Sequence, residues 1–113
     1  MHELSLCEAI ARIATEHAGR QPVSCVHLRI GYLRQVVPDS LQFCWGIVTD
    51  GGPLEGCQLD IDHVPAVVTC NECGTSSTLE DPILVCASCA SGDTVLQSGD
   101  EFLVLAIDIL EVK

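Results

Sequence analysis

The sequence predicts an α+β fold, in which a small three-stranded sheet with two helices carries an inserted zinc-ribbon-like lobe. Three observations lead to this fold class. Apolar residues recur at helical spacing in two segments, and they alternate with polar residues or form a continuous run in three others. Two C-x-x-C pairs lie between the second and third predicted strands. We therefore expect one α+β domain from residues 1–65 and 100–113, and an inserted metal-binding lobe over 66–99.

The first predicted helix runs roughly from residue 5 to residue 18. Ser5 and Glu8 match the S-x-x-E capping box, which places the helix start at Ser5 and leaves residues 1–3 outside the helix. Gly19 is a typical stop signal. The expected apolar stripe consists of Leu6, Ile10, Ile13 and His17, with Cys7 and Ala14 beside it.

A second helix is predicted after Pro38, a residue that suits a first helical turn. It ends before the run Asp50-Gly-Gly-Pro53, which is typical of a turn. The three strands are expected near residues 24–33, 56–64 and 101–111. The core-facing residues of the second helix are predicted to be Leu41, Cys44, Trp45 and Val48.

The charge of the chain argues against several functions. Sixteen acidic residues face five Lys and Arg, which gives a formal net charge of -11 over 113 residues. Thirteen of the acids fall between positions 35 and 112, where Lys and Arg are absent. Nucleic-acid binding needs basic side chains to neutralise phosphates, so we expect no nucleic-acid partner. The acidity favours solubility, and a basic partner or the attraction of metal cations stay as alternatives.

Membrane insertion and secretion are not expected either. The longest apolar stretch, residues 102–110, is too short to span a bilayer and is interrupted by Asp108. The start of the chain does not resemble a secretion signal. A cytoplasmic protein without a membrane partner is the simplest interpretation.

Four cysteines indicate a metal site. The pairs Cys70–Cys73 and Cys86–Cys89 have the spacing of two zinc knuckles, and four thiolates suit a tetrahedral structural zinc. The loop between them carries little hydrophobic mass, so we expect the metal to supply the folding energy of this lobe. Iron in the same ligand set and a pair of disulfides stay as alternatives. A closed set of four thiolates leaves no open position for catalysis.

The remaining cysteines and histidines show no metal-ligand spacing. Cys7, Cys25, Cys44 and Cys57 are interpreted as buried free thiols. His17, His27 and His63 are interpreted as core-edge or surface residues, with a secondary metal role as the alternative.

The first three residues, Met1, His2 and Glu3, offer a different metal chemistry. The α-amine, the amide nitrogen of His2 and its imidazole can close two fused chelate rings around one ion, and the amide of Glu3 can add a fourth nitrogen. Planar nitrogen sets of this kind favour Ni(II) or Cu(II). Taken alone, a histidine at position 2 is also compatible with chance.

The whole chain resembles the HypA family of nickel metallochaperones, which act in [NiFe]-hydrogenase maturation. The resemblance rests on the start MHELSLCE, the E-G-C-x-L segment at Glu55–Leu59, the two knuckles, and Gly99 with Glu101 before the last strand. Two residues depart from the family pattern: Ala87 replaces a common proline, and Ala90 replaces a glycine that often follows the knuckle. All four sulfur ligands are retained.

The resemblance implies a carrier of Ni(II) rather than an enzyme, so no catalytic residues are expected. Nickel would be cargo bound by His2 with backbone nitrogens of Met1 and Glu3, and a structural Zn(II) would be held by Cys70, Cys73, Cys86 and Cys89. The implied partners are a HypB-type maturation GTPase and the precursor of the [NiFe]-hydrogenase large subunit. Two other classes stay open: a zinc-ribbon docking module without nickel transfer, and a redox switch that uses the C-x-x-C pairs.

Overall fold

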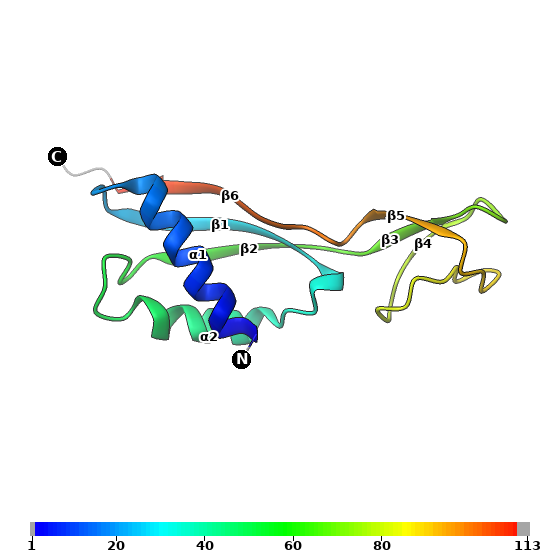
Figure 1. Ribbon diagram of the computed structural model, residues 1–113, viewed down its shortest axis with the longest axis horizontal. Helices are drawn as coiled ribbons and strands as arrows, with labels where there is room; N and C mark the ends of the chain where they lie inside the picture. The colour runs from blue at the N-terminus through cyan, green and yellow to red at the C-terminus, as the bar shows by residue number, and fades with distance from the viewer. Residues whose placement is uncertain (1, 111–113) are drawn as a thin grey trace. The chain divides into compact units, whose positions relative to one another are not determined.

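The computed structural model of the chain describes residues 2–110, and its helices and strands are shown in Figure 1. Two compact units are present: residues 1–29, 36–62 and 103–113 contribute to the first, and residues 30–35 and 63–102 make the second. The predicted boundaries at 65/66 and 99/100 for a separately folding lobe stay a prediction. Within the described residues, neither helix combines the length and apolar character needed to cross a bilayer.

The first unit contains a sheet with the strand order β2-β1-β6, formed by β1 (Val23–Gly31), β2 (Gln58–Val64) and β6 (Phe102–Ile109). The sheet is mixed. Leu110 N–H donates to Pro22 O at one end of β1, and the other end of β1 pairs with the start of β6, so these two strands run in opposite directions. The predicted α+β fold with two helices is confirmed.

Helix α1 (His2–Ala18) begins three residues earlier than predicted, so Ser5 lies inside the helix rather than at its N-cap. Glu3 and Leu4 are good helix formers, and an acid in the first turn favours the helix N-terminus, which outweighs the capping signal. Gly19 ends the helix as predicted, with φ +63° and its N–H bonded to Thr15 O at 3.0 Å. The buried stripe also differs from the prediction: it consists of Cys7, Ile10, Ala14 and Ala18.

Helix α2 (Pro38–Thr49) begins at the predicted proline and packs against α1. Leu41, Cys44 and Trp45 are buried as predicted, but Thr49 takes the buried place expected for Val48. The Trp45 indole Nε1–H donates to Cys57 O at 2.8 Å. This bond ties α2 to the segment that leads into β2.

The two faces of the sheet differ in polarity. Val26 and Leu28 of β1 are buried, while Cys25, His27 and Arg29 alternate with them on the open face.

On that open face, the His27 ring bonds to carboxylates on both neighbouring strands. Nδ1 lies 2.9 Å from Oδ2 of Asp60 on β2, and Nε2 lies 2.8 Å from Oδ2 of Asp108 on β6. Arg29 pairs with Asp62 at 3.0 Å. His27 on β1 pairs with Asp60 on β2, and Arg29, two residues later, pairs with Asp62, two residues after Asp60. Residue numbers therefore increase in the same direction along both strands, as expected for a parallel pair.

The second unit has its own antiparallel sheet, which the sequence did not reveal. Its strand order is β4-β3-β5, from β3 (Val67–Cys70), β4 (Ser76–Thr78) and β5 (Thr94–Ser98). A small apolar core is also present, contrary to the expectation that the lobe lacks one. It consists of Ala66, Val68 and Leu79, with Leu96 and the distant residues Tyr32 and Leu33 packed against it.

Tyr32 and Leu33 reach this core because two glycines allow their backbones to approach closely. The short helix η1 (Tyr32–Arg34) follows Gly31, and a Cβ on Gly31 would lie 2.5 Å from the backbone nitrogen of Asp100. Gly31 N–H donates to Glu101 O at 2.7 Å, and Leu33 N–H donates to Gly99 O at 2.8 Å.

Gly99 itself has φ +107°, and its N–H donates to the Glu101 carboxylate at 2.8 Å. This geometry explains a Gly-x-Glu sequence at this point: glycine supplies the conformation and the glutamate accepts the N–H that the turn exposes.

We expect Gly99→Ala to destabilise the protein by about 2–4 kcal/mol, because the residue would be strained and its Cβ would lie 2.6 Å from the Cβ of Ala66. Urea unfolding at constant metal content measures this loss. Gly46→Ala is the matched control, because Gly46 lies within α2 with open space around it. It should be neutral or slightly stabilising. Equal stabilities of the two variants would contradict the close approach.

The His27 ion pairs predict a pH dependence. The hydrogen bonds that the His27 ring donates to the carboxylates of Asp108 and Asp60 raise the pKa of His27 above its ordinary value. A raised folded-state pKa contributes stability that is fully present below the unfolded pKa and is lost as the pH rises through the folded pKa. His27→Gln should therefore destabilise the protein more at pH 5.5 than at pH 8.5, as measured by urea unfolding of both proteins at each pH. If His27→Gln lowered the free energy of unfolding by the same amount at both pH values, the result would contradict a charged His27.

Candidate metal centre

The four knuckle cysteines converge in the second unit. Cys70 Sγ lies 3.6 Å from Cys89 Sγ, and Cys73 Sγ lies 3.6 Å from Cys86 Sγ. All four sulfur atoms lie within 4.8 Å of one another. Zinc–sulfur bonds of about 2.3 Å in a tetrahedron separate the sulfurs by roughly 3.8 Å, so this set is compact enough to hold a single tetrahedral ion.

Each knuckle is a tight turn that points backbone N–H groups at sulfur. Cys73 N–H donates to Cys70 Sγ at 3.5 Å, and Ser88 N–H donates to Cys86 Sγ at 3.4 Å. Each turn closes through a residue with positive φ, whose N–H bonds to the carbonyl of the first cysteine. This residue is Gly74 at φ +74° in the first knuckle and Ala90 at φ +61° in the second. Ala90 therefore takes a conformation that favours glycine.

The thiols of the cluster differ in how readily they ionise. Thr75, through its hydroxyl and backbone N–H, lowers the pKa of Cys73 to about 6. At Cys89 the backbone N–H of Ser91 lowers the pKa, but hydrogen bonds with the neighbouring cysteines outweigh it and raise the pKa to about 12. A metal ion must displace the protons of such thiols, so binding at this centre releases protons.

The predicted nickel ligands are described only in part. Met1 lies outside the described residues, and of His2 the structure describes the backbone alone. That backbone is helical, as is that of Glu3, whose side chain is half-buried. The expectation that residues 1–3 lie outside the helix is therefore wrong for residues 2 and 3.

A second group of residues with side chains that can bind a metal lies on the open face of the first unit's sheet. The ligand atoms of Cys25, His27 and Asp108 lie within 4.8 Å of one another. Sequence analysis missed this group because it interpreted Cys25 as a buried thiol and His27 as an ordinary histidine. The available signals were Cys25 and His27 at positions i and i+2 of one strand, and an aspartate within an otherwise apolar final strand.

The other cysteines and histidines follow their interpretation more closely. Cys7, Cys44 and Cys57 are buried, whereas Cys25 is only half-buried. Burial raises the pKa of Cys7 to about 12, which makes it a poor nucleophile and ligand. His17 and His63 are exposed.

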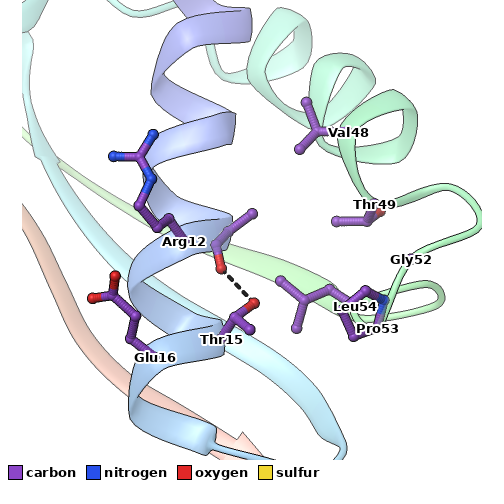
Figure 2. A pocket seen from close by; sticks show the side chains of 9 residues that line it. Arg12, Thr15, Glu16, Val48, Thr49, Gly52, Pro53 and Leu54 are labelled. Carbon is purple, nitrogen blue, oxygen red and sulfur yellow. Dashed lines mark hydrogen bonds between the residues drawn. The ribbon is translucent and has the colours of Figure 1, made fainter.

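A pocket of about 320 Å³ lies between α1 and the segment after α2. Figure 2 shows Thr15 facing Leu54 across it, while Thr15 Oγ1 donates to Ala11 O at 2.7 Å. Arg12 and Glu16 extend from α1 on the side away from Val48. The lining is mainly apolar and does not bring metal ligands together, so this pocket is not a metal site.

The sequence matches a known protein family. The family described as "Hydrogenase/urease nickel incorporation, metallochaperone, hypA" matches residues 1–109. A similar protein from Desulfatibacillum aliphaticivorans, named hydrogenase maturation factor HypA, is 37% identical and covers 98% of this chain and 88% of its own length. A protein of the same name from Chloroflexus aurantiacus is 40% identical, and the alignment covers 96% of this chain and 98% of that protein.

The fold is also similar to that of a solved protein. The solution structure of the Ni metallochaperone HypA from Helicobacter pylori aligns with a TM-score of 0.63 at 20% sequence identity. The alignment covers 97% of this chain and 98% of that one. At this identity the similarity concerns the fold.

The two knuckles predict opposite effects for a pair of substitutions. Ala90→Gly should tighten Zn(II) binding roughly fivefold, or about 1 kcal/mol, because it removes the strain of positive φ and metal affinity includes folding energy. Gly74→Ala should weaken binding by a similar factor, since space around Gly74 is open and only its φ is affected. Competition with a zinc chelator measures both. Tighter binding by Gly74→Ala would contradict this account of the knuckles.

Proposed function

This chain belongs to the HypA family, and on that premise we propose that it is a nickel metallochaperone that binds Ni(II) at its N-terminus and delivers it to the precursor of the [NiFe]-hydrogenase large subunit. The proposed ligands are the α-amine of Met1, the amide and imidazole nitrogens of His2, and the amide of Glu3. A HypB-type GTPase is the proposed partner in handover. The chemistry is binding and release of a metal ion, with no bond in a substrate broken, so the protein is not an enzyme.

The start of α1 supports this ligand set. The first four N–H groups of a helix have no intrahelical acceptor. Because α1 begins at His2, the amides of His2 and Glu3 belong to this group. A nickel ion can therefore replace their protons without breaking a hydrogen bond of the helix. The positive end of the helix dipole also favours the negative charge of a deprotonated amide.

The proposed role of the second unit is structural. Cys70, Cys73, Cys86 and Cys89 fit a tetrahedral Zn(II) and leave no position for an exchangeable ligand. Nickel in a planar nitrogen site and zinc in a tetrahedral sulfur site differ in both ligand type and geometry, which separates cargo from scaffold. Eight free cysteines suit a reducing compartment, so we propose that handover takes place in the cytoplasm.

We expect His2→Ala to abolish stoichiometric Ni(II) binding and to leave the zinc content and the fold unchanged, because the two metals use separate residues. Calorimetric titration of untagged, zinc-loaded protein measures nickel binding, and absorption reports planar Ni(II). A residue added before Met1 should also weaken nickel binding, since it displaces the α-amine from its chelate ring.

His17→Ala is the matched control, because His17 is an exposed histidine at the other end of the same helix. It should bind nickel like the wild type. Equal nickel stoichiometry and affinity in His2→Ala and the wild type would remove the N-terminal site and favour a zinc-ribbon docking module instead.

A further inference from the structure

The open face of the first unit's sheet brings together three different metal-ligand types. Cys25 and His27 lie two residues apart on β1, so their side chains share this face, and Asp108 comes from the adjacent strand β6. These residues supply sulfur, nitrogen and oxygen, the mixed donor set that suits late first-row divalent ions. This cluster shares no residue with the proposed nickel ligands or with the four knuckle cysteines.

The imidazole of His27 is already held in the orientation that a metal ligand needs. Its Nε2 faces Asp108 at 2.8 Å, and its Nδ1 faces Asp60 at 2.9 Å. Metal-bound histidines typically donate their second ring N–H to a carboxylate, which fixes the ring. Asp60 on β2 provides that carboxylate, and loss of the proton between Nε2 and Asp108 would leave both groups as ligands for an ion.

The distances and charges also fit an ion. Tetrahedral ligands of a zinc-sized ion lie about 3.3–3.8 Å apart, and the three ligand atoms lie within 4.8 Å of one another, so side-chain rotation alone can close the set. On binding, the His27 ring and the Cys25 thiol would each lose a proton, and the thiolate and the carboxylate would then neutralise a divalent ion. Nearby Arg29 is engaged with Asp62 and does not compete for Asp108.

The cluster is accessible from solvent. The side chain of His27 is 31% exposed and that of Asp108 is 56% exposed, and Cys25 is half-buried. An ion with three protein ligands keeps a position for water, so it can enter and leave without unfolding the sheet.

From these observations we infer that Cys25, His27 and Asp108 form a third binding site for a divalent transition-metal ion, with Asp60 positioning His27. Zn(II) and Co(II) are suitable probes of this site. It is an exchangeable site, in contrast to the closed cluster of four cysteines.

The test uses the full chain carrying one zinc per molecule, in the His2→Ala background, so that failure of the proposed nickel site does not affect the result. Calorimetric titration with Zn(II) should reveal a second equivalent. Cys25→Ser should weaken this second binding at least about tenfold, and Asp60→Asn should weaken it about 10–100-fold as an outer carboxylate. Asp50→Asn is the matched control: it removes the same charge from an exposed position outside the sheet, leaves the Arg29–Asp62 pair in place, and should bind the second ion like its parent.

Spectroscopy identifies the sulfur ligand directly. Co(II) added to the zinc-loaded protein should produce a thiolate-to-cobalt band in the near ultraviolet while a zinc indicator detects no released zinc, and Cys25→Ser should lose this band. In the wild type, Zn(II) should slow alkylation of Cys25 at least about tenfold, which tests the site even if a variant fails to fold. A stoichiometry that stays at one zinc per chain, or a second equivalent that binds Cys25→Ser and its parent equally, would overturn the inference and leave these residues as ion pairs alone.

Discussion

The close backbone approach between Gly31 and Gly99 is the constraint on which the second unit depends. Side chains at either position would overlap with backbone atoms, so only glycine permits the two segments to exchange hydrogen bonds. Through this contact, Tyr32 and Leu33 reach a core that otherwise consists of Ala66, Val68 and Leu79. The Tyr32 hydroxyl then donates to Glu80 O at 2.6 Å. The four-cysteine cluster is therefore not the only element that holds this unit together, because two residues of η1 complete its apolar core.

Local patterns in the sequence correctly predicted the features that depend mainly on neighbouring residues. Apolar periodicity and Pro38 placed α2, Gly19 ended α1, and the cysteine spacing identified the knuckles. The start of α1 was wrong because a capping signal and helix propensity compete, and the sequence alone does not show which is stronger. The core of the second unit was missed because Tyr32 and Leu33 lie far from it along the chain. The group of Cys25, His27 and Asp108 was missed for the same reason, since its members meet only when β6 pairs with β1.

The proposed metal sites of the protein differ in how easily a bound ion exchanges. The four-cysteine cluster is closed, and its ligands are oriented by backbone N–H groups at fixed turns, which favours permanent binding. The proposed N-terminal chelate and the group around His27 are both built from few ligands. For a proposed metal carrier this division is useful, because an ion that must be handed on needs an incoming ligand to reach it. The two classes also differ in donor atoms, which limits competition between the structural ion and the cargo.

The position of β6 has a consequence for how quickly the sheet assembles. Its partner β1 lies near the start of the chain, and residues 65–101 separate β2 from β6. Pairing of β6 with β1 must therefore close a long loop, and the entropy lost in closing it is offset only once the strands are in contact. Closure of the second unit around a metal ion shortens the flexible part of that loop. Contacts of long sequence separation slow folding, so metal binding before the sheet forms would speed the pairing of β6 with β1. A newly made chain whose four knuckle cysteines hold no ion would leave the edge of β1 unpaired for longer.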